Sequence, residues 1–155
     1  MLFGNKNKFA VECDVTLTTT RWVYGYFWFY LNGHRIGSED DSSVDLNGCR
    51  NWIRDFVNEP CDRYEEHLYD LPKDVVFELL AGENAEVDGY RKYDNIYARF
   101  HISYLGMSSF DEWTILLVKN ELGHERCVWR HRENEILEAY LEKDELENVL
   151  AGFHL

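Results

Sequence analysis

An aromatic segment near the N-terminus constrains the fold of this chain more than any other part of the sequence. Residues 21–31 hold seven aromatic side chains in eleven positions, a density typical of a central β-strand that is covered on both faces. Residues 9–17 alternate apolar and polar side chains with the period of two of a half-buried strand. The dipeptide Asn32-Gly33 accepts the positive φ angles of a type I′ turn. These features predict antiparallel strands followed by a short return strand at 34–37, and Gly25 predicts a bulge or a close approach of another backbone.

Two helices are predicted in the middle of the chain. Ser42 or Ser43 is available to cap the first, which ends at Glu59-Pro60. The apolar positions at helical spacing in this segment are Leu46, Cys49, Ile53, Phe56 and Val57. The second helix begins at Pro72, a residue suited to a first helical position, and ends at Gly82. A polar loop is predicted at residues 83–90.

The remainder returns to strand patterns and ends in a helix. Alternation predicts a strand at 95–104, and a hairpin of 113–119 with 126–131 turns around Gly123. A helical stripe covers residues 134–150, with a kink near Lys143-Asp144 where the stripe slips. We therefore expect one α+β domain over residues 1–155: a mainly antiparallel sheet of about six strands with two central helices and a C-terminal helix.

The charge balance narrows the classes of partner. The 155 residues include 29 acids and 16 bases, a formal net charge of -13. This balance argues against a nucleic-acid binder, which needs basic residues for phosphate contacts, and against binding to an anionic membrane surface. The acids concentrate in two segments, with 15 acids and 4 bases in residues 39–88 and 7 acids and one base in residues 133–155. A high charge supplies solubility in any protein, and it also predicts a basic partner.

The cellular compartment is also predicted. The start of the chain lacks a basic segment followed by an apolar stretch, so we expect no secretory signal, and the apolar run at 22–31 is too short to span a bilayer. The four cysteines are widely scattered and a core of this size needs no disulfide, so reduced thiols and a cytoplasmic location are expected.

Motifs for catalysis or metal binding are weak. His124, Cys127 and His131 are zinc-ligand types at close spacing, but a hairpin with a buried cysteine accounts for them better. Cys61 and His67 could form a thiolate and its base, yet the acids around them would raise the pKa of the thiol. No catalytic residue, cofactor or metal site is therefore predicted. A small Cys/His hydrolase or metal-binding enzyme is kept as an alternative function.

The N-terminal motifs resemble a known family. These motifs are Phe3-Gly4-Asn5, Lys8-Phe9-Ala10-Val11-Glu12, Tyr24-Gly25-Tyr26-Phe27-Trp28-Phe29, Leu31-Asn32-Gly33 and Ile36-Gly37. They are similar to those of the bacterial immunity proteins known as immunity protein 42. The resemblance implies a protein encoded beside a polymorphic or contact-dependent toxin, which it neutralises by direct binding in the cytoplasm.

The resemblance and the charge together predict the function. The expected partner is the C-terminal domain of the cognate toxin, a basic nuclease, which an acidic surface of this chain would occlude; no nucleic acid, membrane or cofactor is expected to bind. An acidic mimic of nucleic acid is a further alternative. The predicted toxin-binding residues are acids of the two charged segments with one tyrosine as an anchor: Glu39, Asp40, Asp41, Glu65, Glu66, Tyr69, Glu138, Glu142, Asp144 and Glu145.

Overall fold

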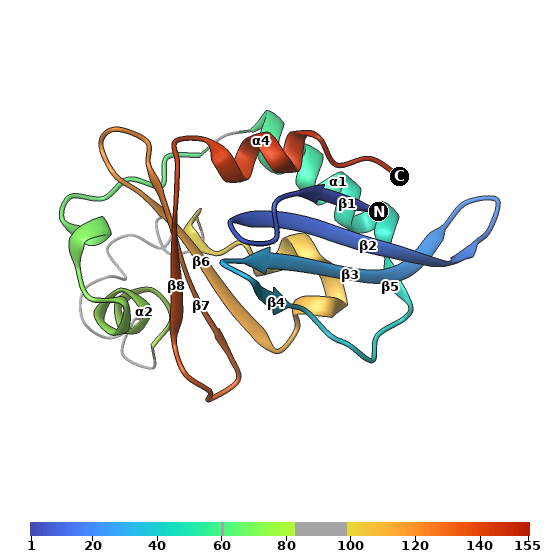
Figure 1. Cartoon of the computed structure of the whole chain (residues 1–155), viewed down its shortest axis with the longest axis horizontal. Coiled ribbons are helices and arrows are strands. Elements are labelled where there is room, and N and C mark those ends of the chain that lie inside the picture. Colours follow the sequence, from blue (N-terminus) through green and yellow to red (C-terminus); the bar gives the residue numbers. More distant parts are fainter. Residues whose placement is uncertain (60, 83–98) are drawn as a thin grey trace. The chain divides into compact units, whose positions relative to one another are not determined.

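The structure, a computed structural model, describes residues 1–59, 61–82 and 99–155 and divides the chain into two compact units (Figure 1). Unit 1 comprises Met1–Pro60, Ser103–Glu112 and Asp144–Leu155, and unit 2 comprises Cys61–Ile102 and Trp113–Lys143. The polar loop predicted at 83–90 and the first part of the strand predicted at 95–104 lie outside the described residues.

Unit 1 is built on an antiparallel sheet with the strand order β1-β2-β3-β4. A short strand, β5, also pairs with β3. The strands are β1 (Leu2–Gly4), β2 (Phe9–Thr18), β3 (Val23–Leu31), β4 (His34–Ile36) and β5 (Val44–Asp45). The aromatic segment is therefore a central strand, as its composition predicts.

The local backbone of this sheet confirms both glycine predictions. Asn32 and Gly33 have φ angles of 49° and 82° between β3 and β4, as a type I′ turn requires. The register of β2 against β3 shifts between Val15 and Leu17, opposite Gly25. A Cβ atom at Gly25 would collide with the carbonyl oxygen of Asp14, so the position admits only glycine.

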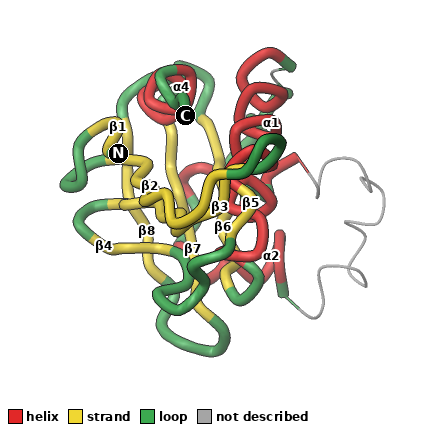
Figure 2. Tube along the Cα trace, turned by 90° about the vertical axis from the view of Figure 1, so that its right-hand side faces the viewer, coloured by secondary structure: helices red, strands yellow, loops and turns green. Residues whose placement is uncertain are grey.

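Helices cover one face of this sheet, with aromatic side chains between the layers. Helix α1 (Leu46–Asn58) and helix α4 (Glu145–Ala151) lie side by side, and the 3-10 segment η3 (Ser103–Phe110) also packs on β3 (Figures 1 and 2). The ring of Phe110 lies 4.9 Å from that of Phe29 and 5.8 Å from that of Phe27, between centroids. Edge-to-face and tilted contacts of this kind stabilise the core beyond the area that they bury.

The cap predicted for the first helix is wrong by two or three residues. Asp45, and neither Ser42 nor Ser43, caps α1, because its carboxylate accepts a hydrogen bond of 3.0 Å from the backbone N–H of Gly48. The reason is β5, whose pairing with β3 keeps Val44 and Asp45 extended, so the helix begins only after them.

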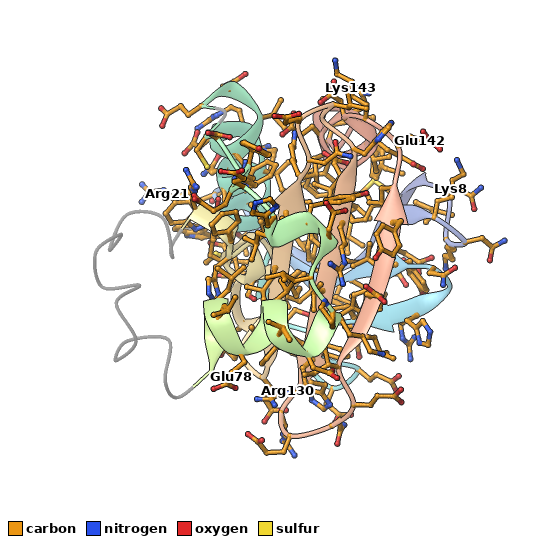
Figure 3. The ribbon with its side chains drawn as sticks, turned by 90° about the vertical axis from the view of Figure 1, so that its left-hand side faces the viewer. Lys8, Arg21, Glu78, Arg130, Glu142 and Lys143 are labelled. Carbon is orange, nitrogen blue, oxygen red and sulfur yellow. The ribbon has the colours of Figure 1, made fainter. Side chains whose placement is uncertain are left out.

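Unit 2 holds the second antiparallel sheet, of order β6-β7-β8. Its strands are β6 (Trp113–Lys119), β7 (Glu125–His131) and β8 (Leu137–Leu141). Helix α2 (Lys73–Ala81) lies over this sheet and buries Val76, Phe77 and Leu80 in a core with Val118 and Val128 (Figure 3). No helix of the described residues is both long and apolar enough to cross a membrane.

The predicted α+β class with antiparallel pairing is confirmed, but the described residues form eight strands in two sheets rather than about six strands in one sheet. Two assignments are wrong. Residues 137–141 of the predicted C-terminal helix are strand β8, and α4 begins only at Glu145, after Asp144 with its positive φ of 57°. In the described part of the strand predicted at 95–104, His101 makes an isolated bridge and η3 follows from Ser103. In this segment, the alternation of apolar and polar residues reflects the burial of alternate side chains, although the backbone does not pair continuously as a strand.

The side chain of Asp41 is held by hydrogen bonds within unit 1. Its carboxylate accepts hydrogen bonds from the N–H and hydroxyl of Ser43, at 3.0 and 3.1 Å, and from the hydroxyl of Ser108, at 2.6 Å. Partial burial would raise the pKa of this carboxyl, but the hydrogen bonds outweigh burial and lower the pKa below its ordinary value. The ionised carboxylate of Asp41 therefore contributes its full stabilisation of the folded state at pH values above the ordinary pKa of an aspartate. This contribution is lost as the pH falls through the lower pKa of the folded state.

We expect Asp41→Asn to lower the free energy of unfolding by about 1–2 kcal/mol at neutral pH, because a neutral amide replaces a charged acceptor. The difference from wild type should shrink in acid, where the wild-type carboxyl is itself protonated. Urea unfolding at about pH 7 and about pH 2 measures both quantities. Asp40→Asn is the matched control, since Asp40 is exposed and its side chain forms no hydrogen bond or ion pair with another described residue. An equal loss in both variants would contradict the assignment.

Candidate functional site

The candidate site is an acidic, tyrosine-lined pocket in unit 2 with a volume of about 360 Å³. It forms between the segment around the 3-10 turn η1 (Leu68–Asp70) and the turn that joins β6 to β7. We call it the Tyr69 surface and define it by Tyr64, Glu65, Glu66, His67, Tyr69, Asp70, Asn120, Glu121 and Leu122. Three of the predicted toxin-binding residues, Glu65, Glu66 and Tyr69, are therefore brought together.

Backbone pairing places the first wall of the pocket. Tyr64 forms a parallel bridge with Lys119 at the end of β6, and the N–H of Lys119 donates to the carbonyl of Arg63 at 2.9 Å. The chain then reverses at His67, whose φ is 68°, and buries Leu68 in the core of unit 2. His67 before this leucine is exposed, whereas Tyr69 after it is half-buried and packs against the same core.

The second wall is a turn that Asn120 holds rigid. The Asn120 side-chain oxygen accepts hydrogen bonds from the N–H groups of Leu122 and His124, at 3.0 and 2.9 Å. Gly123, with φ at 83°, completes the reversal. Leu122 at the tip is 70% exposed, the largest exposed fraction among the large apolar side chains of the described residues. An exposed apolar side chain on a rigid turn is a suitable anchor for a partner protein.

A buried arginine holds η1 against the sheet. The Arg126 guanidinium on β7 donates to the carbonyl oxygens of Tyr69 and Leu71, at 2.7 and 2.6 Å, and pairs with the Glu138 carboxylate at 2.7 Å. Arg126 is only 2% exposed, so these acceptors replace its hydration. The backbone on both sides of Asp70 is thereby fixed to the sheet.

The same arginine places a second tyrosine beside the first. Tyr140 on β8 lies with its ring centroid 5.3 Å from the Arg126 guanidinium and 5.9 Å from the ring of Tyr69. Its side chain is 60% exposed. As part of the helix predicted at 134–150, Tyr140 would belong to the buried stripe; in strand β8 it alternates with buried Ala139 and Leu141 and points outward. The period-two pattern of 137–141 was the signal that could have identified it.

Carboxylates surround these rings. Glu65 pairs with Arg99 at 3.0 Å and Glu66 with His67 at 3.2 Å, while the Tyr64 hydroxyl donates to Glu121 at 3.4 Å. Burial and then the charge of Glu121 raise the pKa of Tyr64. Burial, the neighbouring Tyr140 phenol and the charges of Asp70 and Glu142 likewise raise the pKa of Tyr69, against the opposing effect of Arg126. Both phenols therefore remain neutral in a negative potential, an environment that favours lysine or arginine side chains of a partner.

The other predicted residues lie in several places. In unit 2, Glu138 pairs with Arg126, and Glu142 follows β8 (Figure 3) and contributes to the raised pKa of Tyr69. Unit 1 holds the remaining five: Glu39 pairs with Arg35, Asp40 is exposed, Asp41 is bonded to Ser43 and Ser108, Asp144 precedes α4, and Glu145 lies 3.6 Å from Lys8. Arg126, Glu121, Leu122 and Tyr140 were absent from the predicted set.

Cys127 and His131, two of the residues considered as zinc ligands, lie in strand β7. Cys127 is fully buried in β7, and burial raises the pKa of its thiol. The ring of His131 stacks on Trp113 at 4.5 Å between centroids, within the same sheet. Across the described residues, no three His, Cys, Asp or Glu side chains are placed to hold a metal ion.

Comparisons with known proteins place the chain among immunity proteins. The sequence model of the family described as immunity protein 42 matches residues 1–154. A solved structure with a similar fold is that of CdiI from Burkholderia dolosa, with 19% sequence identity and a TM-score of 0.78. The similarity covers 97% of this chain and 96% of that chain. Among curated proteins, no sequence matches this chain.

The role of Arg126 gives a prediction on stability. We expect Arg126→Met to lower the free energy of unfolding by about 3 kcal/mol, because it leaves Glu138 and two backbone carbonyls without their donor. Glu138→Gln should cost only about 1 kcal/mol, since the amide oxygen still accepts a hydrogen bond. Urea unfolding measures both variants. An unchanged midpoint for Arg126→Met would mean that η1 is held by other contacts.

Proposed function

This chain belongs to the immunity protein 42 family, and we propose that it neutralises a cognate toxin by binding a basic domain of the toxin through the Tyr69 surface. The observation that carries the proposal is the pair of exposed anchors, Leu122 and Tyr140, beside a pocket lined by carboxylates. Buried aromatic and apolar anchors supply most of the binding energy of protein interfaces, while surrounding charges guide association and select the partner.

The charge of the surface favours a particular class of toxin. A nuclease needs a basic groove to hold phosphates, and a surface with several carboxylates is complementary to such a groove. Fields of this kind raise association rates by roughly 10 to 10³ fold. We therefore propose a basic nuclease domain at the C-terminus of the toxin as the partner, and occlusion of its phosphate-binding groove as the mechanism.

Inhibition by occlusion needs no chemistry on the part of this chain. A stoichiometric complex protects the cell for as long as it stays bound, so we propose a non-enzymatic inhibitor that acts in the cytoplasm, requires no cofactor and binds no nucleic acid itself. The family match spans residues of both units, and we accordingly propose that residues 1–155 act as a single immunity domain.

The role of charge in binding is tested with two double charge-reversal variants that change the net charge by the same amount. Glu65→Lys with Glu66→Lys should weaken binding to the toxin domain encoded immediately upstream by about tenfold or more, mainly through slower association. Glu39→Lys with Asp40→Lys is the matched control in unit 1, because each pair contains adjacent acids of which one is held by an arginine. Surface plasmon resonance at two salt concentrations measures the association rates.

If the two double variants lose affinity equally, the net charge and not the Tyr69 surface controls binding. If the upstream protein is harmless to cells or does not co-purify with this chain, the immunity proposal itself is overturned.

The anchor prediction concerns dissociation. Tyr140→Ala should weaken the complex by about ten- to a hundredfold, mainly through faster dissociation, because an exposed ring that is buried on binding is removed. Tyr104→Ala is the control, since Tyr104 in unit 1 is also exposed, by 41%, and packs on a neighbouring ring, that of Trp52. An equal effect of both substitutions would place the contact elsewhere.

A further inference from the structure

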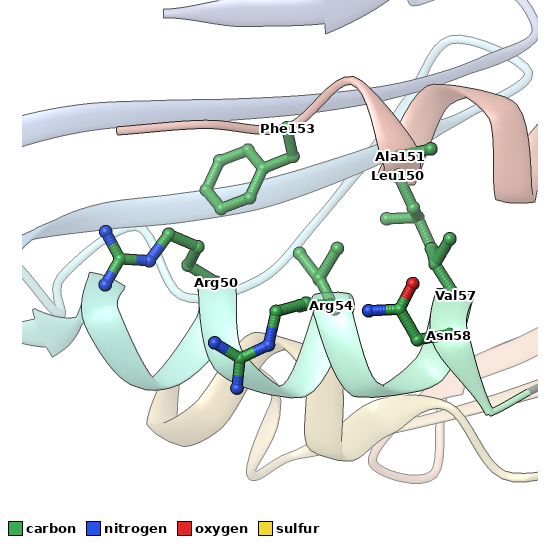
Figure 4. A pocket seen from close by; sticks show the side chains of 8 residues that line it. Arg50, Arg54, Val57, Asn58, Leu150, Ala151 and Phe153 are labelled. Carbon is green, nitrogen blue, oxygen red and sulfur yellow. The ribbon is translucent and has the colours of Figure 1, made fainter.

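Unit 1 contains a groove of opposite chemical character to the Tyr69 surface. It has a volume of about 370 Å³ and is lined by Arg50, Ile53, Arg54, Val57, Asn58, Leu150, Ala151 and Phe153 (Figure 4). We infer that this α1/α4 groove binds an acidic peptide segment of a partner protein, one that carries a bulky apolar side chain between carboxylates.

The floor of the groove is apolar and comes from two helices. Ile53 and Val57 lie one turn apart on α1, and Leu150 and Phe153 face them from α4 and the residues that follow it. Ile53, Leu150 and Phe153 are nearly buried within unit 1, so the floor is already packed before anything binds. A groove between packed helices accepts apolar side chains without prior rearrangement.

Two arginines line the same groove. Arg50 and Arg54 are also one turn apart on α1, which places their side chains roughly 5–6 Å apart at the Cβ atoms. Figure 4 shows both guanidinium groups extending along α1. Alternate side chains of an extended peptide are separated by about 7 Å, so two carboxylates that flank one apolar residue can reach both arginines.

These arginines are also available for pairing. Arg50 forms no side-chain hydrogen bond or ion pair with another described residue, and Arg54 pairs with its neighbour Asp55, at 3.2 Å, with both side chains at least half exposed. Exposed pairs of this kind contribute little. In contrast, Lys6, Lys8 and Arg35 of unit 1 already pair with glutamates. Charge complementarity therefore points to carboxylates as the groups that complete the groove.

The net charge of the chain makes the proposal sharply testable. At -13, the molecule as a whole repels an acidic peptide and attracts a basic one. Charges beyond a Debye length, about 8 Å at physiological ionic strength, are largely screened, whereas Arg50 and Arg54 would contact the peptide directly. A preference for the acidic peptide can therefore come only from a local basic site.

The experiment measures fluorescence anisotropy of three labelled peptides with the full chain. The probe is acetyl-Glu-Glu-Phe-Glu-Glu-amide; its matched peptides replace all glutamates by lysine or replace Phe by Ser. We expect the probe to bind, the serine peptide to bind about tenfold more weakly, and Arg50→Glu with Arg54→Glu to abolish binding of the probe. Arg21→Glu is the control substitution, because Arg21 is an exposed arginine of unit 1 outside the groove. Circular dichroism establishes that each variant is folded.

Four results would overturn the inference. The probe could fail to bind at micromolar protein, or bind equally to the Arg50→Glu, Arg54→Glu variant. Sodium octanoate could instead bind in a manner that depends on these arginines while the peptide does not, which would identify a small amphiphile as the occupant. Binding of the lysine peptide alone would likewise exclude a local site for carboxylates.

Discussion

The buried guanidinium of Arg126 is the interaction on which the proposed toxin-binding surface depends. A cation that is 2% exposed has lost its hydration, and it must recover that free energy from acceptors within unit 2. It does so with Glu138 and with two carbonyls of the chain around η1. Those carbonyls flank Asp70. The hydrogen bonds that compensate the charge of Arg126 therefore also determine where Tyr69 and Tyr140 lie on the surface.

Two surfaces of opposite charge within one acidic chain are compatible because electrostatic interactions are local in salt solution. The Tyr69 surface places Glu65, Glu66, Asp70 and Glu121 around neutral tyrosines. The α1/α4 groove places two arginines beside an apolar floor. Screening over about 8 Å lets each surface act on its own ligand, while the net charge governs only the approach from a distance.

The sequence predicted the elements that short-range signals determine. The prediction failed where one pattern of apolar residues fits both a helix and a strand. The Asn32-Gly33 turn, α2 and the hairpin of β6 with β7 follow from short-range signals, and the structure confirms them. The segment at 137–141 fits a helical stripe and a strand equally well, and pairing with β7 decides for the strand. That choice reverses the orientation of Tyr140, so the helical assignment missed the main anchor of the candidate site. Arg126 was missed for a related reason: a charged residue in a strand predicts exposure unless its acceptors are known.

The division between residues that position the surface and residues that contact a partner has a consequence for specificity. Leu122 and Tyr140 are 70% and 60% exposed, so their replacement costs less stability than replacement of a core residue. Asn120 and Gly123 shape the turn that carries Leu122, whereas Arg126 fixes the chain around Tyr69 and lies against the ring of Tyr140. A toxin-binding surface built in this way can change its partner through its exposed side chains while the supporting contacts stay constant. The specificity of such an inhibitor is therefore separable from its fold, because different atoms carry the two properties.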